Sequence, residues 1–437
     1  MKKLHLLWFL AGIQPRGWLD PRWGTGYDFR RKDVYLDGAR TLERACFDGI
    51  FVADQPTIDT SYSGTIEPLI RSGYESISAD PMPIMAMIGA HTEHIGVVGT
   101  YSSTYTPPFL LARMMNALDH LTDGRAGWNV VTSARLSDGD NFGVPLPPPE
   151  QRYDMADEYV ALCKQLWRSW DPDAVLLDRE AEEFADPAKV RHIDFEGKWY
   201  RSRGPLPMPA SPQVVPVIFQ AGASDRGRIF GAANAEVIMG NQNSTVGMKS
   251  FVDDVTAIAA RLGRPDRPKF VFNVQPVIGE TEEIAQARFA VLKERAKTRP
   301  YLDGGLGFAS QATGTDFGRL DLDVPLADQL DRLGVTRNPQ SLIFQYVNED
   351  PAVTPRDIGE REALKMTLPV VGTAESVADR LCEVAEETGA DGFQFRESLH
   401  PSYLADICDG LVPALQRRGA ARTEYSGKTF RENLNEF

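Results

Sequence analysis

The feature that most constrains this sequence is a regular alternation of short apolar runs with longer amphipathic stretches. Such alternation is typical of βα units, in which each buried parallel strand is followed by a helix that covers the sheet. The predicted buried strands are Leu4–Phe9, Gly49–Ala53, Ile95–Gly99, Ala126–Val131, Val215–Gln220, Glu236–Met239, Phe270–Ile278 and Gly392–Phe395. Eight parallel strands are the number that closes a barrel. The sequence therefore predicts an α/β fold, a (β/α)8 TIM barrel with insertions.

Three of the intervening helices are marked by apolar residues at helical spacing, which predicts a core-facing stripe on each. The first follows Thr106 as its N-cap, has Pro107 and Pro108 in its first turn, and is expected to bury Leu110, Met114, Ala117, Leu118 and Leu121. The second is expected to bury Tyr159, Leu162, Cys163 and Leu166. The third runs between Thr373 and Gly389 and is expected to bury Val377, Leu381, Val384 and Ala385.

Two stretches do not fit a plain βα repeat. Residues 171–212 are polar and Pro-rich, with a possible hairpin around His192–Tyr200, and residues 301–369 are long and mixed. Insertions of that size often cover the mouth of a barrel. We therefore expect residues 1–437 to form one barrel domain with insertions at about 171–212 and 301–369, the second of them a lid.

Charge and hydropathy exclude several functions. The chain has 47 basic and 61 acidic residues, a net charge of −14, which repels nucleic acid and anionic lipid. No apolar stretch is long enough to span a membrane, and the run from Leu4 to Ile13 fits a first strand better than a signal peptide because His5 interrupts it. We expect no nucleic-acid partner, no membrane partner and a cytoplasmic location.

The cysteines agree with that location. They are few, far apart and without a CxxC pair: Cys46, Cys163, Cys382 and Cys408. Buried reduced thiols are therefore the simplest interpretation.

Polar residues cluster where four predicted strands end. The clusters are Phe51–Asp54, Gly99–Ser103, Gly127–Ser133 and Gln220–Ser224. Any one of them could be an ordinary helix cap. Because reacting groups of α/β barrels lie at the carboxyl ends of the strands, four such clusters together favour a shared site.

The cluster Gly222–Arg228 has the pattern of an anion site. A strand enters a Gly turn and Ser224 then opens a helix, so that exposed N–H groups and the helix dipole favour a phosphate there. Ser224 could donate its hydroxyl, and Arg226 or Arg228 could supply charge. The alternative is that Ser224 only caps its helix and that both arginines are solvated.

Several motifs are missing. No GxGxxG follows the first strand, and the glycine-rich run Gly304–Gly307 lies in the second insertion and not at a strand–helix turn. The sequence also has no Walker A loop, GxSxG or HExxH. His91 and His94 are three residues apart on a stretch that we expect to be helical, but no third ligand accompanies them. The sequence predicts neither a nicotinamide-binding Rossmann domain nor a metal site.

Two blocks carry a family resemblance. Residues 118–133 read LDHLTDGRAGWNVVTS, and residues 152–159 read RYDMADEY. The chain resembles the bacterial luciferase-like, flavin-dependent monooxygenases, in the branch that contains the nitrilotriacetate, EDTA, dibenzothiophene-sulfone and long-chain alkane monooxygenases. Supporting blocks lie at 51–54, 100–105, 141–143, 219–228 and 412–419.

The resemblance implies a luciferase-like TIM barrel with FMN at its C-terminal face. Carried over by position, Asp54 would lie near the isoalloxazine, Thr100 would contact the ring system and Asn129 would line the pocket floor. Tyr153, Ser224 and the backbone of Ala223 would bind the phosphate. The phosphate site would then follow the fifth strand, whereas barrel phosphate sites usually follow strands seven and eight.

The resemblance also implies an activity. The chain would be an FMNH2-dependent monooxygenase of a two-component system, which uses O2 to oxygenate a small organic substrate and receives reduced flavin from a separate NAD(P)H:FMN reductase. A homodimer or homotetramer would be expected. The alternatives are a deazaflavin-dependent oxidoreductase on the same fold and a non-catalytic flavin-binding relative.

Two departures keep the catalytic residue unknown. Pro149 stands where some members have a His four residues before the tyrosine of the RYD block, and Ala134 stands where the alkane enzyme has a His after VTS. That enzyme's cysteine near the N-terminus also has no counterpart in this chain. No acid–base residue is therefore transferred.

Overall fold

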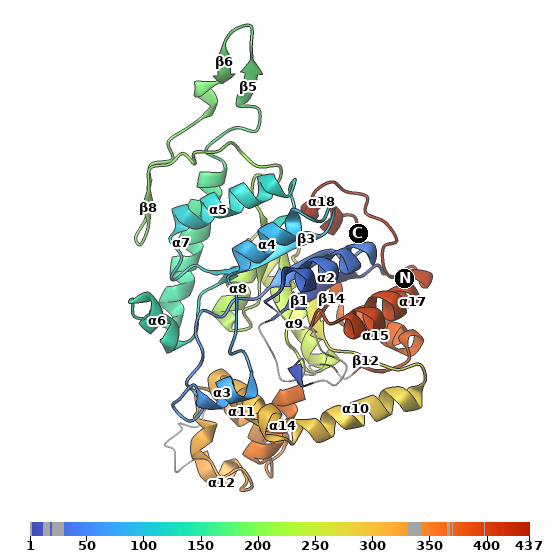
Figure 1. Ribbon diagram of the computed structural model, residues 1–437. Helices are drawn as coiled ribbons and strands as arrows, with labels where there is room; N and C mark the ends of the chain where they lie inside the picture. Colours follow the sequence, from blue (N-terminus) through green and yellow to red (C-terminus); the bar gives the residue numbers. More distant parts are fainter. Residues whose placement is uncertain are drawn as a thin grey trace.

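Eight parallel strands close into a barrel in the computed structural model, which describes residues 2–11, 18–19, 30–330, 342–364, 368, 370–396 and 398–437 (Figure 1). Around the barrel the order is β1, β14, β11, β10, β9, β4, β3, β2. The strands are β1 His5–Leu10, β2 Gly49–Val52, β3 Gly96–Ser102, β4 Ala126–Val131, β9 Val217–Gln220, β10 Val237–Gly240, β11 Lys269–Val274 and β14 Gly392–Phe395. All eight overlap the predicted runs, so the predicted TIM barrel is confirmed.

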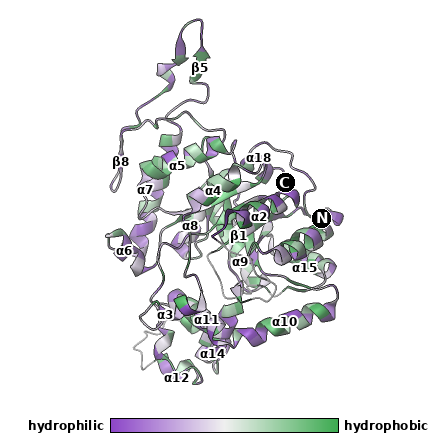
Figure 2. Cartoon of the chain, in the orientation of Figure 1, coloured by the Kyte–Doolittle hydropathy of each residue, from purple (hydrophilic) through white to green (hydrophobic). Residues whose placement is uncertain are grey.

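Helices cover the outside of the barrel and turn their apolar faces toward it (Figure 2). The outer layer comprises α2 Lys32–Arg44, α4 Pro81–Gly89, α5 Pro108–Leu121, α7 Pro149–Trp167, α8 Asp225–Asn234, α9 Thr245–Arg261, α15 Ala374–Thr388, α16 Pro401–Leu404, the π-helical turn Ala405–Leu411 and α17 Val412–Arg417. The predicted stripes of α7 and α15 are buried, and α15 begins after Thr373 and ends at Gly389 as predicted. All four cysteines are buried free thiols, which confirms that prediction.

The predicted face of α5 is only partly right, since Leu118 is buried as predicted and Met114 and Ala117 are half-buried. Leu110 and Leu121 are exposed, whereas Leu111 and Met115 are fully buried. The helix is apolar on several sides, so its sequence periodicity does not specify one face. The N-cap is Pro107 and not Thr106.

The seventh predicted strand is really two. β11 ends at Val274, and β12 (Val277–Ile278) leaves the barrel to pair with β13 (Val371–Gly372). Pro276, which lies between them, has no N–H to donate to a neighbouring strand, and this separates the two pieces.

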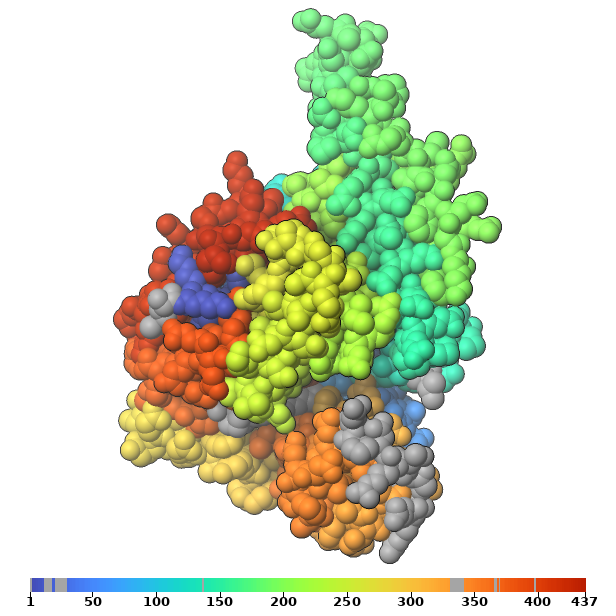
Figure 3. All heavy atoms as spheres, turned by 180° about the vertical axis from the view of Figure 1, so that it is seen from behind, coloured from blue at the N-terminus to red at the C-terminus, as the bar shows by residue number. Residues whose placement is uncertain are grey.

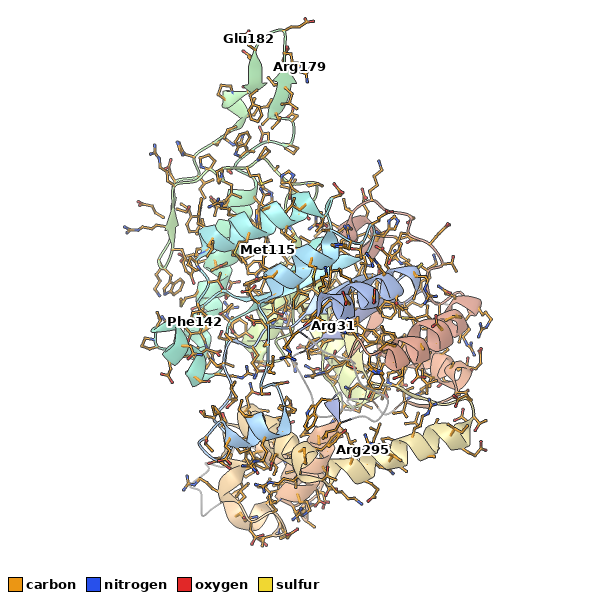
Figure 4. All side chains as sticks on the ribbon, viewed as in Figure 1. Arg31, Met115, Phe142, Arg179, Glu182 and Arg295 are labelled. Carbon is orange, nitrogen blue, oxygen red and sulfur yellow. The ribbon has the colours of Figure 1, made fainter. Side chains whose placement is uncertain are left out.

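The first insertion forms two hairpins. β5 (Val175–Asp178) and β6 (Glu183–Ala185) build an arm that projects beyond the amino ends of the barrel strands, with Arg179 and Glu182 at its tip (Figure 4). This arm points away from the C-terminal mouth, so the expectation that such an insertion covers the mouth is wrong for it. After the turn Pro187–Lys189, β7 (Phe195–Glu196) and β8 (Arg201–Ser202) form the hairpin predicted around His192–Tyr200.

The second insertion lies at the carboxyl ends of the strands, next to α3 (Glu67–Ser72) (Figure 1). Its helices are α11 Arg299–Thr313, α12 Ala327–Leu330, α13 Leu342–Glu349 and α14 Pro355–Leu364, with a short helical turn at Phe317–Arg319. They share an apolar cluster that includes Leu306, Phe317 and Ile358. A Cβ on Gly305 would lie 1.9 Å from the carbonyl oxygen of Gly359, so α11 and α14 touch through their backbones. Residues 331–341, 365–367 and 369 of this predicted insertion lie outside the described residues.

Two further helices are α6 (Leu136–Phe142), after β4, and α10 (Glu282–Ala296), before α11. Within the described ranges, no helix combines the length and apolarity needed to cross a membrane. His91 and His94 lie in the turn after α4 and not on a helix, and both are exposed.

The amino end of the barrel is closed by the C-terminal helix α18 (Phe430–Leu434). The Phe430 ring enters beneath three strand glycines, where a Cβ on Gly96 would lie 2.5 Å from the ring and Cβ atoms on Gly49 and Gly127 would lie 3.1 and 3.3 Å from it. It stacks on Phe219 with a centroid distance of 5.9 Å. Three residues without side chains thus make room for one aromatic plug.

We predict that Phe430→Ala lowers the free energy of unfolding by about 3–5 kcal/mol, because the cavity it leaves is walled by strands that cannot collapse. Urea unfolding followed by circular dichroism measures the change. Phe184→Ala on the arm, where the ring is 62% exposed, is the control and should cost less than about 0.5 kcal/mol. Equal losses for the two variants would contradict the role of Phe430.

Candidate active site at the carboxyl end of the barrel

The barrel interior changes from apolar to polar toward the carboxyl ends of its strands. The inward side chains Leu7, Phe51, Val98, Val217 and Phe219 form one apolar cluster with Phe430. Above it, the inward positions carry polar side chains: Thr100, Asn129, Asn241, Asn273 and Gln394. A polar floor at the carboxyl end is where barrels place ligands.

The predicted pair Thr100 and Asn129 is in direct contact. The two residues are register partners on β3 and β4, and the Asn129 Nδ2 donates to the Thr100 Oγ1 at 3.1 Å. Their side chains are 5% and 3% exposed.

Three amide atoms of this floor lack hydrogen-bond partners among the described residues. They are the Asn129 carbonyl oxygen, Oδ1, and both amide atoms of Gln394, a residue with no exposed surface. Gln394 lies beside Asn273, its register partner on β11. A buried amide without a partner costs about 1–3 kcal/mol, so such groups mark places where a ligand completes the hydrogen bonds.

The other predicted residues surround the turn between β9 and α8. Ser224 is the N-cap of α8, and its Oγ accepts from the Gly227 N–H at 3.1 Å. The Tyr153 hydroxyl comes from α7 and would lie 2.6 and 2.7 Å from Cβ atoms built on Gly222 and Gly227, so a side chain at either position would displace it. Ala223 and Ser224 are exposed. The hydroxyls of Tyr153 and Ser224 therefore both lie close to Gly227 at the start of α8, and a helix N-terminus suits an anion.

The two arginines of this segment are partly exposed and both are ion-paired. Arg226 pairs with Asp154, at 3.0 Å, and with Asp157. Arg228 pairs with Asp254 at 2.9 Å and donates to the Ala223 carbonyl at 3.0 Å. They tie α8 to its neighbours α7 and α9, so the anion site rests on hydroxyls and amides.

Asp54 follows β2 at the mouth and is half-buried. Burial and the nearby charge of Asp80 raise its pKa from 3.8 to about 6. Asp80 is fixed, because it caps α4 by accepting from the Met82 N–H and also accepts from the Tyr101 hydroxyl at 2.7 Å. Asp54 is therefore a carboxyl group that can hold or release a proton close to neutral pH.

A cavity of about 510 Å³ begins at Gln55, the neighbour of Asp54. Hydroxyls and amides dominate its wall, which is lined by Gln55, Pro56, Thr57, Ile58, Thr60, Ile66, Glu75, Ser76, Ser78, Ser137, Asp140 and Asn141. It contains two carboxylates and, among the described residues, no Lys or Arg. Phe142 marks the adjoining end of α6 in Figure 4 and stacks on Tyr105 at 4.8 Å.

Sequence reasoning missed Gln394 and Asn273. Both are lone polar residues within runs of aromatic and aliphatic residues, Gly-Phe-Gln-Phe and Val-Phe-Asn-Val. That contrast is the signal that could have found them, since a polar side chain at the centre of a buried strand needs a reason.

Comparison with known proteins agrees with the fold and with the family resemblance of the sequence blocks. The model of the family "Luciferase-like monooxygenase" matches residues 25–392. The dibenzothiophene-sulfone monooxygenase of Rhodococcus erythropolis is 37% identical over 413 residues, 93% of this chain and 90% of that protein. Component A of the nitrilotriacetate monooxygenase of Aminobacter aminovorans is 32% identical over 99% of this chain and 95% of that protein.

Solved structures agree with these matches. A long-chain alkane monooxygenase superposes with a TM-score of 0.88 at 30% identity, covering 99% of this chain and 96% of that one. A riboflavin lyase solved with modified FMN and riboflavin gives a TM-score of 0.85 at 31% identity over 99% and 96% of the two chains. The chain belongs to the luciferase-like monooxygenase family, as its sequence blocks predicted.

The two residues that depart from the family pattern, Pro149 and Ala134, both occupy positions that suit them structurally. Pro149 is the first residue of α7, a position at which proline suits a helix. Ala134 is exposed and follows Ser133, whose hydroxyl lies 2.8 Å from that of Ser102. Within the described ranges, no three His, Cys, Asp or Glu side chains are grouped to hold a metal ion.

We predict that Asp54→Asn stabilises the protein at pH 8 but not at pH 4. Because the folded-state pKa of Asp54 is about 6 and its ordinary value is 3.8, its favourable contribution is complete below pH 4 and is lost as the pH rises through 6. Asparagine carries no charge at any pH, so the variant does not lose stability as the pH rises. The gain at pH 8 should be on the order of 1–2 kcal/mol after allowance for partial solvent exposure. Urea unfolding at both pH values tests this, and a gain that does not depend on pH would contradict it.

Proposed function

We propose that this protein is an FMN-dependent monooxygenase of a two-component system, which uses reduced FMN and O2 to oxygenate a small organic substrate. A separate NAD(P)H:FMN reductase would supply the reduced flavin. The observation that carries the proposal is the buried polar floor with unsatisfied amides at Asn129 and Gln394, below a helix N-terminus suited to phosphate. Family membership supports the same cofactor.

The residues of the floor and the turn fit FMN. Asn129 and Gln394 offer donors and acceptors for the polar edge of an isoalloxazine, and Thr100 lies beside Asn129. The phosphate would lie against the first-turn amides of α8 with the hydroxyls of Tyr153 and Ser224. When bound, the reduced flavin supplies the activation of O2. Asp54, at the mouth, would hold or deliver a proton during the reaction.

Exclusion of water is the second task of the chain. The helices α11 and α14 lie over the carboxyl end of the barrel and are packed through their backbones at Gly305 and Gly359. We propose that the second insertion is the lid, since it covers the mouth with an apolar core of its own.

The cavity beside Asp54 is the proposed route for the substrate. Its wall presents hydroxyls, amides and two carboxylates, Glu75 and Asp140. Glu75 is balanced by Arg135 and Arg396, at 3.6 and 3.4 Å, so the wall is mainly neutral and polar and suits an uncharged polar substrate.

We predict that the purified chain alone oxidises NADH at no more than background rate. No dinucleotide-binding fingerprint follows any predicted strand, so hydride must reach the flavin through another protein. With FMN, NADH and a flavin reductase, substrate-dependent O2 uptake should follow, measured with an oxygen electrode. A reductase-only reaction is the control, and robust NADH oxidation by the chain alone would contradict the proposal.

We predict that Ser224→Ala weakens FMN binding by about two- to tenfold, the cost of one neutral hydrogen bond. Ser224→Asp should weaken it more, by at least about tenfold, because it sets like charge against phosphate. Fluorescence quenching of FMN measures the affinities. Ser244→Ala and Ser244→Asp are matched controls, since Ser244 caps α9 through Gly247 as Ser224 caps α8 through Gly227. Equal affinities across the Ser224 series would place the phosphate elsewhere.

A further inference from the structure

A second cavity lies at the opposite end of the barrel from the proposed flavin site. It has a volume of about 710 Å³ and is lined by Lys164, Arg168, Trp170, Asp171, Pro172, Arg191, Gln213, Val214, Val215, Ile218, Ala233, Asn234, Glu236, Arg264 and Arg431. Figure 3 shows the face where the dark-red C-terminal segment, the yellow segment near residue 264 and the green base of the arm come together. The cavity includes the C-terminal end of α8, whereas the flavin phosphate site uses the N-terminus of the same helix.

The wall of this cavity carries an excess of positive charge. It has five cationic side chains and two carboxylates in a chain whose net charge is −14. The carboxylates are already engaged, because Asp171 pairs with Arg191 at 2.6 Å and Glu236 with Arg431 at 2.6 Å.

Three of the cations form no ion pair within 4.0 Å in the described part of the chain. Their hydrogen bonds go to neutral oxygens only. Lys164 donates to the Asn234 Oδ1 at 3.5 Å, Arg168 to the Lys164 carbonyl at 3.4 Å and Arg264 to the Ala232 carbonyl at 3.0 Å. Each retains further N–H groups that can serve a ligand.

The three charges also oppose one another. Burial lowers the pKa of Lys164, and the neighbouring charges of Arg168 and Arg264 lower it further, against a smaller opposite effect of Glu236 and Asp157. Burial likewise lowers the pKa of Arg264. Lys164 and Arg264 are half-buried and Arg168 lies exposed beside them, and an anion placed among the three would relieve their repulsion.

We propose that this cavity binds a phosphate-bearing small organic molecule, with the phosphate held by Lys164, Arg168 and Arg264. Three cationic groups with several N–H donors each match the many oxygens of a phosphate better than the two of a carboxylate. The volume far exceeds that of a phosphate ion, and Trp170, Val215 and Ile218 offer an apolar wall for an organic part.

The site is distinct from the flavin phosphate site. The ten residues of α8 separate the two, a length of about 15 Å at 1.5 Å per residue. Ligands can therefore occupy both ends of the helix at once.

Isothermal titration calorimetry of the full chain with AMP and with inorganic phosphate, at constant ionic strength, tests the proposal. We expect one saturable AMP site, and several-fold tighter binding of AMP than of inorganic phosphate. The double variant Lys164→Gln/Arg264→Gln should lose at least about tenfold in AMP affinity, since two charge-assisted contacts are removed. Circular dichroism checks that each variant is folded.

Two control variants distinguish binding in this cavity from a general effect of charge and from binding at the flavin site. Arg113→Gln/Arg261→Gln removes the same charge from exposed helical positions that do not line the cavity and should leave AMP affinity unchanged. Ser224→Asp disables the proposed flavin phosphate site and should also leave it unchanged. Absence of AMP binding, equal losses in both double variants, or loss of binding in Ser224→Asp alone would each overturn the proposal. Equal affinity for AMP and inorganic phosphate would overturn the organic part of it.

Discussion

The aromatic plug at the amino end of the barrel is the constraint on which the rest of this structure depends. Phe430 occupies the space that Gly49, Gly96 and Gly127 leave open, and Phe219 stacks on it. The C-terminal segment that carries Phe430 is anchored by Arg422, which donates to the buried Asp48 at 2.7 Å, and by Arg431, which is paired with Glu236. Because this end is filled by apolar groups, polar ligands can enter the barrel only from the carboxyl end.

The sequence block that identifies the family is mainly a structural joint between α5 and β4. Asp119 is fully buried and accepts from the Ala126 N–H at 3.1 Å and from the Gln213 side chain at 2.6 Å. Arg125 is 3% exposed and donates five hydrogen bonds, to Gly89, Thr92, Ile95 and Thr122. Within residues 118–131 of this block, Asn129 is the residue whose side chain lies in the pocket floor. The hydrogen bonds of Asp119 and Arg125 hold the start of β4 in place, and this fixes the position of Asn129 further along the same strand.

The strands were predictable because parallel strands buried on both faces are nearly continuous apolar runs. Other elements depend on tertiary context. The buried face of α5 is decided by neighbours on both of its sides, and the partners of Arg226 and Arg228 are Asp154, Asp157 and Asp254, which are distant in the sequence. Thr100 and Asn129 could be found at strand ends, but Gln394 could not be assigned an inward direction until the closed barrel fixed which of its neighbours face the helices.

Two buried polar groups show how the fold separates framework from site. Arg125 and Gln394 are both almost completely removed from solvent, yet the first is fully engaged and the second has no partner in the described part of the chain. The fold gives the Arg125 guanidinium its hydrogen-bond acceptors but leaves the Gln394 amide without partners, which lowers the stability of the protein by about 1–3 kcal/mol. Stability alone would favour an apolar residue there, as in the layer beneath. A ligand with complementary donors and acceptors would recover that cost, so the unsatisfied floor marks a place for a bound ligand.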